Sequence, residues 1–204
     1  VANALETAEG GRQVLKELQD RRPEDVAFEV MYDTTVFVDA TIKSVVKTLI
    51  EAFVLVAVVV FLFLGSVRAT LIPIIAVPVA LIGTFAVMQM MGFSLNTVSL
   101  LALVLAIGLV VDDAIVVVEA VEHSLEKEPH LTPAEATEKA MAEVTGPIVA
   151  ITLVLLSVFI PTAFMPGIAG KLYQQFALTI SVAMVISAIN ALSLSPALCA
   201  VLLS

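Results

Sequence analysis

Two adjacent carboxylates, Asp112 and Asp113, lie near the middle of an apolar stretch, where their chemistry is proton exchange or cation binding. The stretch, residues 96–122, is long and apolar enough to cross a bilayer as a helix. A charged side chain at bilayer depth costs roughly 2.5–3.5 kcal/mol on insertion scales, and the pair costs about twice that. The two carboxylates must therefore face protein or water, carry protons, or meet a cation.

The cation is not found inside the apolar stretches of this sequence. Each of the ten Lys and Arg residues lies in a turn, in a loop or close to the end of a span. The aspartates are thus expected either to bind protons, shared between them as a coupled pair, or to meet a cation on helices outside this chain. Both options point to ion handling. The alternative is structural, with Asp112 and Asp113 hydrogen-bonded to polar groups of neighbouring helices.

Small residues beside the aspartates predict close helix packing. Gly108 lies one turn before Asp112 and would let another helix approach the carboxylates. A repeat of small residues at every fourth position marks the last apolar stretch: Ala183, Ser187, Ala191 and Ser195. We interpret this stripe as a helix-packing surface. Glu119 and Glu122, near the inner end of the aspartate helix, are interpreted as solvated boundary residues.

The composition identifies an integral membrane protein and excludes other classes. The chain is 60% hydrophobic and 14% charged, whereas soluble domains are about 45–50% apolar and about 25% charged. Its basic residues are too few and scattered for a nucleic-acid surface. The single Cys199 excludes an intrachain disulfide. No ligand spacing around His123 or His130 indicates a metal site.

Five membrane-spanning helices are expected in residues 39–204, and they make an all-α bundle. The predicted spans are about 45–64, 71–91, 97–121, 146–164 and 176–203, the last interrupted at Pro196. A polar loop, 123–143, joins the third and fourth spans, and within it Thr132 to Glu135 has the pattern of a helix start. The distribution of Lys and Arg favours a cytoplasmic location for this loop.

Residues 1–38 are soluble in character. Apolar spacing predicts a helix over 3–19, alternation predicts a strand over 26–32, and Asp33 to Thr35 offers capping groups for the next helix. A helix and a strand are too small to bury a core alone, so we expect them to end a larger soluble domain. With Val1 in place of an initiating Met, the chain is interpreted as an internal piece of a longer polypeptide.

The aspartate helix resembles the fourth transmembrane helix of resistance–nodulation–division (RND) efflux pumps. The resemblance rests on the run from Gly108 to Glu119, GLVVDDAIVVVE, and continues along nearly the whole chain. Other matching stretches keep the family's order: residues 46–52, 68–73, 136–139, 159–161 and 195–199. The double aspartate is similar to that of the hydrophobe/amphiphile branch, the multidrug exporters.

This resemblance implies a role for each part of the chain. It makes Asp112 and Asp113 a proton-relay pair, with Lys and Arg partners on helices of a second half, and residues 1–38 the end of a periplasmic α+β porter subdomain. It further implies a homotrimer in the Gram-negative inner membrane, surrounded by lipid and working with a periplasmic adaptor and an outer-membrane channel. The proton-motive force takes the place of a cofactor, and no catalytic residue or metal is implied.

Two other functions stay open beside proton-driven export of hydrophobic or amphiphilic compounds. One is a heavy-metal or lipid exporter of the same superfamily. The other is a non-transporting membrane module, such as a sensor or a scaffold for partner helices. A cation within the membrane, elsewhere in the polypeptide, would favour the transporter over the module.

Overall fold

The computed structural model describes residues 4–19, 30, 33, 35–93 and 97–203, in which all regular structure is α-helical. The helices are α1 (Ala4–Gln19), α2 (Thr35–Leu64), α3 (Val67–Met90), α4 (Thr97–Lys127), α5 (Pro133–Thr162), α6 (Gly167–Leu192) and α7 (Leu194–Leu202). Among the described residues, five segments are long and apolar enough to cross a membrane: Ile42–Leu64, Val67–Met90, Thr97–Lys127, Pro133–Thr162 and Ala169–Leu202. The predicted all-α bundle with five spans is confirmed. The strand predicted over 26–32 lies, apart from Val30, outside the described residues.

The chain divides into two compact units, residues 1–46 and 47–204. In the first unit, Asp33 caps the start of α2 as predicted, since the Thr35 backbone N–H donates to its carboxylate at 2.9 Å. The Thr35 hydroxyl and the Arg12 guanidinium also bond this carboxylate, and together these contacts hold the pKa of Asp33 at about 2. Helix α2 runs unbroken past residue 38, where the sequence suggested a domain boundary.

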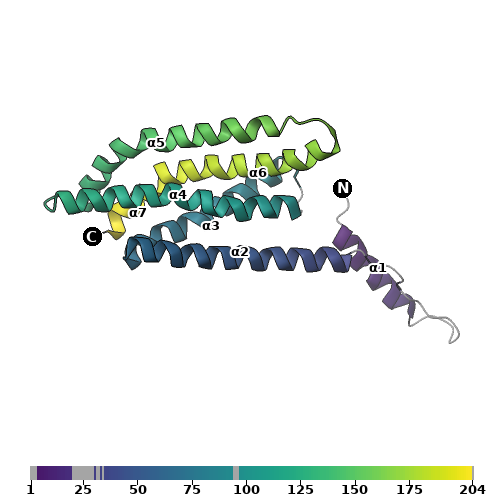
Figure 1. Ribbon diagram of the computed structural model, residues 1–204. Helices are drawn as coiled ribbons and strands as arrows, with labels where there is room; N and C mark the ends of the chain where they lie inside the picture. The colour runs from purple at the N-terminus through teal and green to yellow at the C-terminus, as the bar shows by residue number, and fades with distance from the viewer. Residues whose placement is uncertain (1–3, 20–29, 31–32, 34, 94–96, 204) are drawn as a thin grey trace. The chain divides into compact units, whose positions relative to one another are not determined.

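The second unit is a bundle in which α4 packs against α3, α5, α6 and α7. Figure 1 shows α2 and α5 on opposite sides of this group. Buried apolar residues follow α4 in three layers, around Ala102, around Ile107 to Val111, and around Val117 to Val121. One face of α2 completes the middle layer through Val60. The helix that carries the aspartates is therefore the structural centre of the bundle.

Two helix ends differ from the sequence expectation. The predicted interruption at Pro196 lies earlier, at Ser193, where α6 gives way to α7. A proline lacks an N–H and is tolerated in the first turn of a helix, so Pro196 lies in the first turn of α7, which begins at Leu194, and the break precedes it. The predicted loop over 123–143 is mostly helical, because α4 continues to Lys127 and α5 begins at Pro133.

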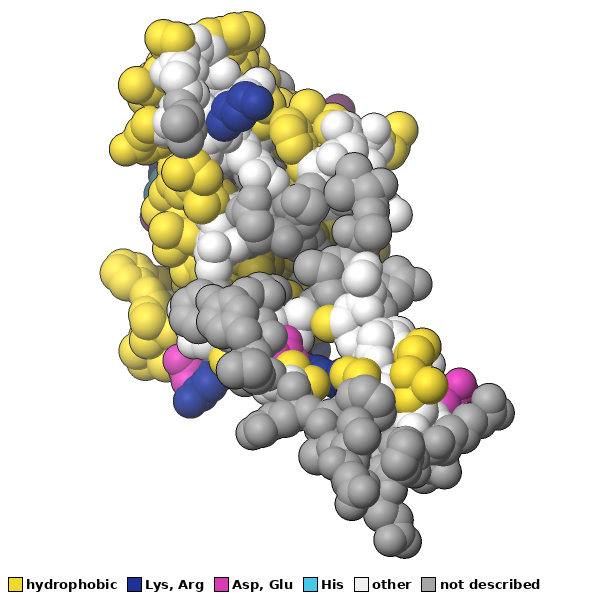
Figure 2. Space-filling view, turned by 90° about the vertical axis from the view of Figure 1, so that its right-hand side faces the viewer, with side chains coloured by type: hydrophobic (Ala, Val, Ile, Leu, Met, Phe, Trp, Pro, Cys, Tyr) yellow, Lys and Arg dark blue, Asp and Glu magenta, His cyan; other side chains and the backbone are white. Residues whose placement is uncertain are grey.

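The outer surface of the bundle is apolar. On the face shown in Figure 2, hydrophobic side chains cover much of the described surface and charged ones are few. Helix α2 exposes large side chains such as Leu55, Leu62 and Phe63, the last of them 85% exposed. Such an apolar surface suits contact with lipid or with further apolar helices.

The turn from α2 into α3 is short, and it relies on Gly65, whose φ of +63° lies in the left-handed region that favours glycine.

The start of α5 is a capping box, as predicted from Thr132 and Glu135. The Glu135 N–H donates to the Thr132 hydroxyl at 3.3 Å, and the Thr132 N–H donates to the Glu135 carboxylate at 2.8 Å. The backbone and side-chain bonds from Thr132 lower the pKa of Glu135. The stabilisation of this helix start by Glu135 is thus complete above its ordinary pKa and disappears as pH falls through the lowered value.

Replacing Thr132 by Ala is expected to weaken the first turn of α5 by about 1 kcal/mol, the usual cost of losing a cap. The measurement is hydrogen–deuterium exchange at the amides of residues 134–137, which are expected to exchange faster in the variant. Thr145→Ala is the matched control, because the Thr145 hydroxyl bonds the Met141 carbonyl of the same helix and lies away from its first turn. Equal exchange in both variants would contradict the capping role.

Candidate functional site

Asp113 is held by a hydroxyl from a neighbouring helix. The Ser187 hydroxyl of α6 donates to the Asp113 carboxylate of α4 at 2.6 Å, and it lies 3.4 Å from the Val110 carbonyl. Ser187 is only 2% exposed and Asp113 is half-buried, so this bond lies inside the bundle. One carboxylate of the predicted pair therefore faces protein and has a fixed orientation.

Asp112 points to a different side of α4, because successive residues of a helix are about 100° apart. It is exposed, and in the described ranges no hydrogen bond or ion pair reaches its carboxylate. Gly108, one turn earlier, is also exposed, and a Cβ built there would meet no atom within 4 Å. Leu101 and Leu105 extend the same uncovered side of α4. A packing partner for Gly108 thus remains a prediction that concerns helices beyond this chain.

The small-residue stripe of the last span packs as predicted. Ala183, Ser187, Ala191 and Ser195 are all at most 2% exposed. In the sequence, Ser187 was interpreted only as part of this packing surface, and its bond to Asp113 was missed. A serine in a stripe that faces a helix with two aspartates was the available signal.

A second buried polar residue on α6, Asn190, was also missed. It is 9% exposed, and its side-chain amide donates to the Ala76 carbonyl of α3 at 3.5 Å. An amide within an apolar span was the signal that could have identified it, since polar groups inside membranes usually bond across helices. Helix α6 therefore contacts α4 and α3 through polar side chains that lie one turn apart.

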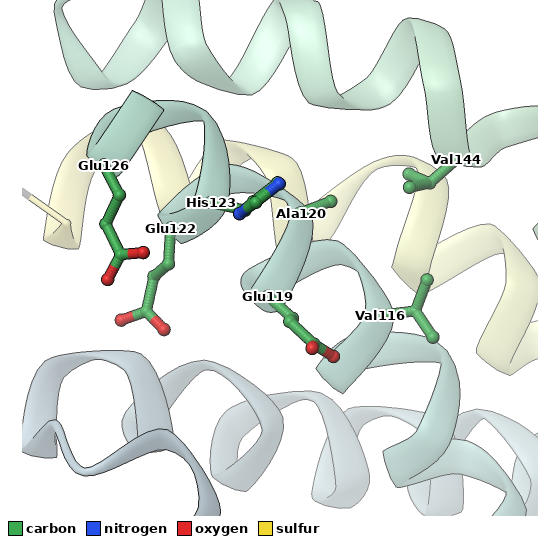
Figure 3. A pocket seen from close by; sticks show the side chains of 7 residues that line it. All are labelled: Val116, Glu119, Ala120, Glu122, His123, Glu126 and Val144. Atoms are coloured by element: carbon green, nitrogen blue, oxygen red, sulfur yellow. The ribbon is translucent and has the colours of Figure 1, made fainter. Parts of the chain in front are cut away.

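A cavity of about 500 Å³ lies beside the C-terminal turns of α4. Figure 3 shows that the carboxylates of Glu119, Glu122 and Glu126 reach to the same side of the helix. His123 lines the cavity too, and it points away from these three carboxylates. Glu119 is exposed, in agreement with the solvated position expected for it, whereas Glu122 is half-buried.

The arrangement around Asp113 suits a reversible change of charge. Two carboxylates follow each other on one central helix, one bonded inside the bundle and one on an open side. Uptake of a proton would remove charge from a place where charge is expensive, and release would restore it. The open side of α4 leaves Asp112 free to meet a group from another part of the protein.

Comparison with a family and comparison with individual proteins give results that agree with each other. The AcrB/AcrD/AcrF family matches residues 1–204. The chain is 54% identical over 202 residues, 99% of its length, to the multidrug export protein AcrF of Escherichia coli. It is 48% identical over 202 residues to the multidrug resistance protein MdtF of the same species. It is also 49% identical over 201 residues to the solvent-resistant pump membrane transporter SrpB of Pseudomonas putida. The chain spans 19% of the length of each of these relatives.

Proposed function

Because the chain belongs to the AcrB/AcrD/AcrF family, we propose that it forms part of a proton-driven exporter of hydrophobic or amphiphilic compounds. The names of its relatives, multidrug export protein and solvent-resistant pump, support this class of substrate. The proposal concerns the whole polypeptide, of which this chain supplies a central part of one membrane domain. The activity is transport rather than a covalent reaction.

The observation that carries the proposal is the carboxylate pair on α4. Asp112 and Asp113 occupy a helix that packs against four others, and Ser187 holds Asp113 by a bond of 2.6 Å. A structural role would be satisfied by one bonded carboxylate. A second carboxylate on the open side of the same helix, with no bond in the described residues, is better explained by exchange of protons or of a cationic partner.

The transport cycle follows from the charge of the pair. When Asp112 and Asp113 are both deprotonated, their negative charge attracts a Lys or Arg on membrane helices of the remaining polypeptide. A proton entering from the periplasm neutralises part of this charge, weakens the attraction and lets the helices repack. Its release to the cytoplasm restores the first state, and the two arrangements of the helices drive the movement of substrate elsewhere in the protein.

The free energy released when one proton crosses the membrane is a useful fraction of the free energy needed to switch the helices between their two arrangements. Each charge that crosses the membrane supplies about 2.3 kcal/mol per 100 mV, to which the pH gradient adds. Moving a two-state element from 1:99 to 99:1 takes about 5.5 kcal/mol. A typical proton-motive force therefore covers a large part of the change in one step.

The assembly and location are proposed on the same basis. The exporter is a multi-pass homotrimer in the inner membrane of a Gram-negative bacterium, with lipid on its outer face. Residues 1–38 lie in the periplasm as the end of a porter subdomain, and the connection between α4 and α5 lies in the cytoplasm. A periplasmic adaptor and an outer-membrane channel complete the route.

The experiment uses cells that make the full-length protein and lack their own exporters. They are loaded with a fluorescent amphiphile, and its loss is followed with and without a protonophore. We expect loss of the dye that stops when the proton gradient collapses. Dye loss that is insensitive to the protonophore, or none at a normal amount of protein in the membrane, would favour another energy source or the non-transporting module.

Ser187→Ala tests the hydroxyl that orients Asp113. A hydrogen bond to a charged group is worth about 1.5–3 kcal/mol, so its loss is expected to slow efflux about tenfold. Ser187→Thr keeps a hydroxyl and is expected to retain most of the activity. Ser193→Ala is the control, because Ser193 follows the end of α6 and its hydroxyl bonds the Ile189 carbonyl of that helix. A Ser187→Ala protein with undiminished efflux would remove Ser187 from the relay.

A further inference from the structure

Two neighbouring buried polar side chains of helix α6 bond two different helices. Ser187 donates to Asp113 of α4 at 2.6 Å, and Asn190 donates to the Ala76 carbonyl of α3 at 3.5 Å. The two residues are three positions apart, so they are neighbours on the surface of α6. Any movement of this turn of α6 is therefore shared by a carboxylate on one side and a backbone carbonyl on the other.

The segment of α3 that Asn190 contacts is the part of that helix most easily bent. Pro73 and Pro78 both lie inside α3, and Ala76 lies between them. A proline has no N–H to donate, so the carbonyls four residues earlier, of Ala69 and Ile74, lack their usual partner within the helix. Sharp bends of helices occur at such positions. The Asn190 amide, which belongs to another helix, therefore contacts the least rigid part of α3.

Beyond Pro78, α3 is held tightly against α6. A Cβ added at Gly83 would lie 3.2 Å from the Ile186 side chain, so the two helices approach closely at this point. Further along, the Thr179 hydroxyl lies 3.6 Å from the Met88 sulfur. These contacts fix the part of α3 that follows Pro78 to α6. The part of α3 that precedes Pro73 can then change direction relative to it by bending between the two prolines.

We propose that Asn190 is a positioning residue that couples the charge of Asp113 to the bend of α3, an inference that rests on the proposed proton relay. When Asp113 takes up a proton, its bond from Ser187 weakens and the turn of α6 that carries both residues shifts. Asn190 passes this shift to the Ala76 carbonyl and changes the bend between Pro73 and Pro78. The ionisable neighbour of Asp113 in the described part of the chain is Asp112, on the same helix.

The test uses the full-length exporter with Asn190→Leu, which keeps a similar volume and removes the amide. Efflux of the fluorescent amphiphile is expected to fall about threefold or more, a size common for mutations that lie between coupled sites. The amount of protein in the membrane and its thermal stability are expected to stay unchanged. Asn190→Gln retains an amide donor and is expected to recover part of the rate, whereas Ser193→Ala is expected to leave the rate unchanged.

A double variant separates coupling from simple packing. If Ser187 and Asn190 act through the same turn, Ser187→Ala combined with Asn190→Leu transports about as fast as the slower single variant. If they act independently, their fold losses multiply. Multiplied losses, unchanged efflux in Asn190→Leu, or a loss that follows reduced thermal stability would overturn the inference. Dye loss by the unmodified exporter that ignores a protonophore would instead refute the proposed function itself.

Discussion

Asp113→Asn in the proposed full-length exporter is expected to reduce efflux to the background of cells without the protein. The amide has nearly the shape of the carboxylic acid and accepts a hydrogen bond from Ser187, so the local packing stays. It carries no charge and takes up no proton, and so it fixes the site in its neutral state. Asp112→Asn is expected to have the same effect through the open side of α4. Folding and the proposed trimer assembly are expected to remain nearly intact.

The measurement is efflux of a fluorescent amphiphile from cells that contain equal amounts of each variant. Glu51→Gln is a matched control, since Glu51 is exposed and pairs with Lys47 at 3.7 Å on the same helix, far along the sequence from the relay. It is expected to transport at the normal rate. Undiminished, proton-dependent efflux in either aspartate variant would exclude that aspartate from the mechanism.

Ala183→Leu is expected to destabilise the bundle strongly. Ala183 has no exposed surface and lies one turn before Ser187 on a helix that packs against α3, α4 and α5. Extra methylenes in a packed interior typically cost 1–3 kcal/mol, because neighbours must leave their preferred rotamers. The variant is therefore expected to yield less folded protein and to lose its structure at a lower temperature in detergent.

The matched control for this variant is Ala150→Leu, at an exposed position of the span in α5. It adds the same volume on the outer side of a helix and is expected to leave stability almost unchanged. Folded yield is measured by size-exclusion chromatography and stability by thermal unfolding. Equal loss in both variants would show that added volume, rather than the packing of the small-residue stripe, is responsible.

The elements of the fold could be predicted because each depends on local pattern. The five spans follow from runs of apolar residues, and the starts of α2 and α5 follow from capping groups at Asp33 and Thr132. The break after α6 was placed too late, because the proline that signals it is tolerated inside the first turn of the next helix.

The candidate site could be predicted only in part. Asp112 and Asp113 stand out because ionisable groups are rare inside membranes. The bond from Ser187 to Asp113 joins residues 74 positions apart, and the bond from Asn190 to Ala76 joins residues 114 positions apart. Such pairings depend on the register of packed helices, which a periodic pattern alone does not determine.

The two-residue turn at Gly65 and Ser66 also has a consequence for the order of folding. Because so little chain separates α2 from α3, their adjoining ends meet at a very high effective concentration, and their contact closes only a short loop. Contacts of low sequence separation form fastest. The adjoining ends of α2 and α3 are therefore expected to come together early in biosynthesis, before α6, synthesised about a hundred residues later, arrives to complete the site.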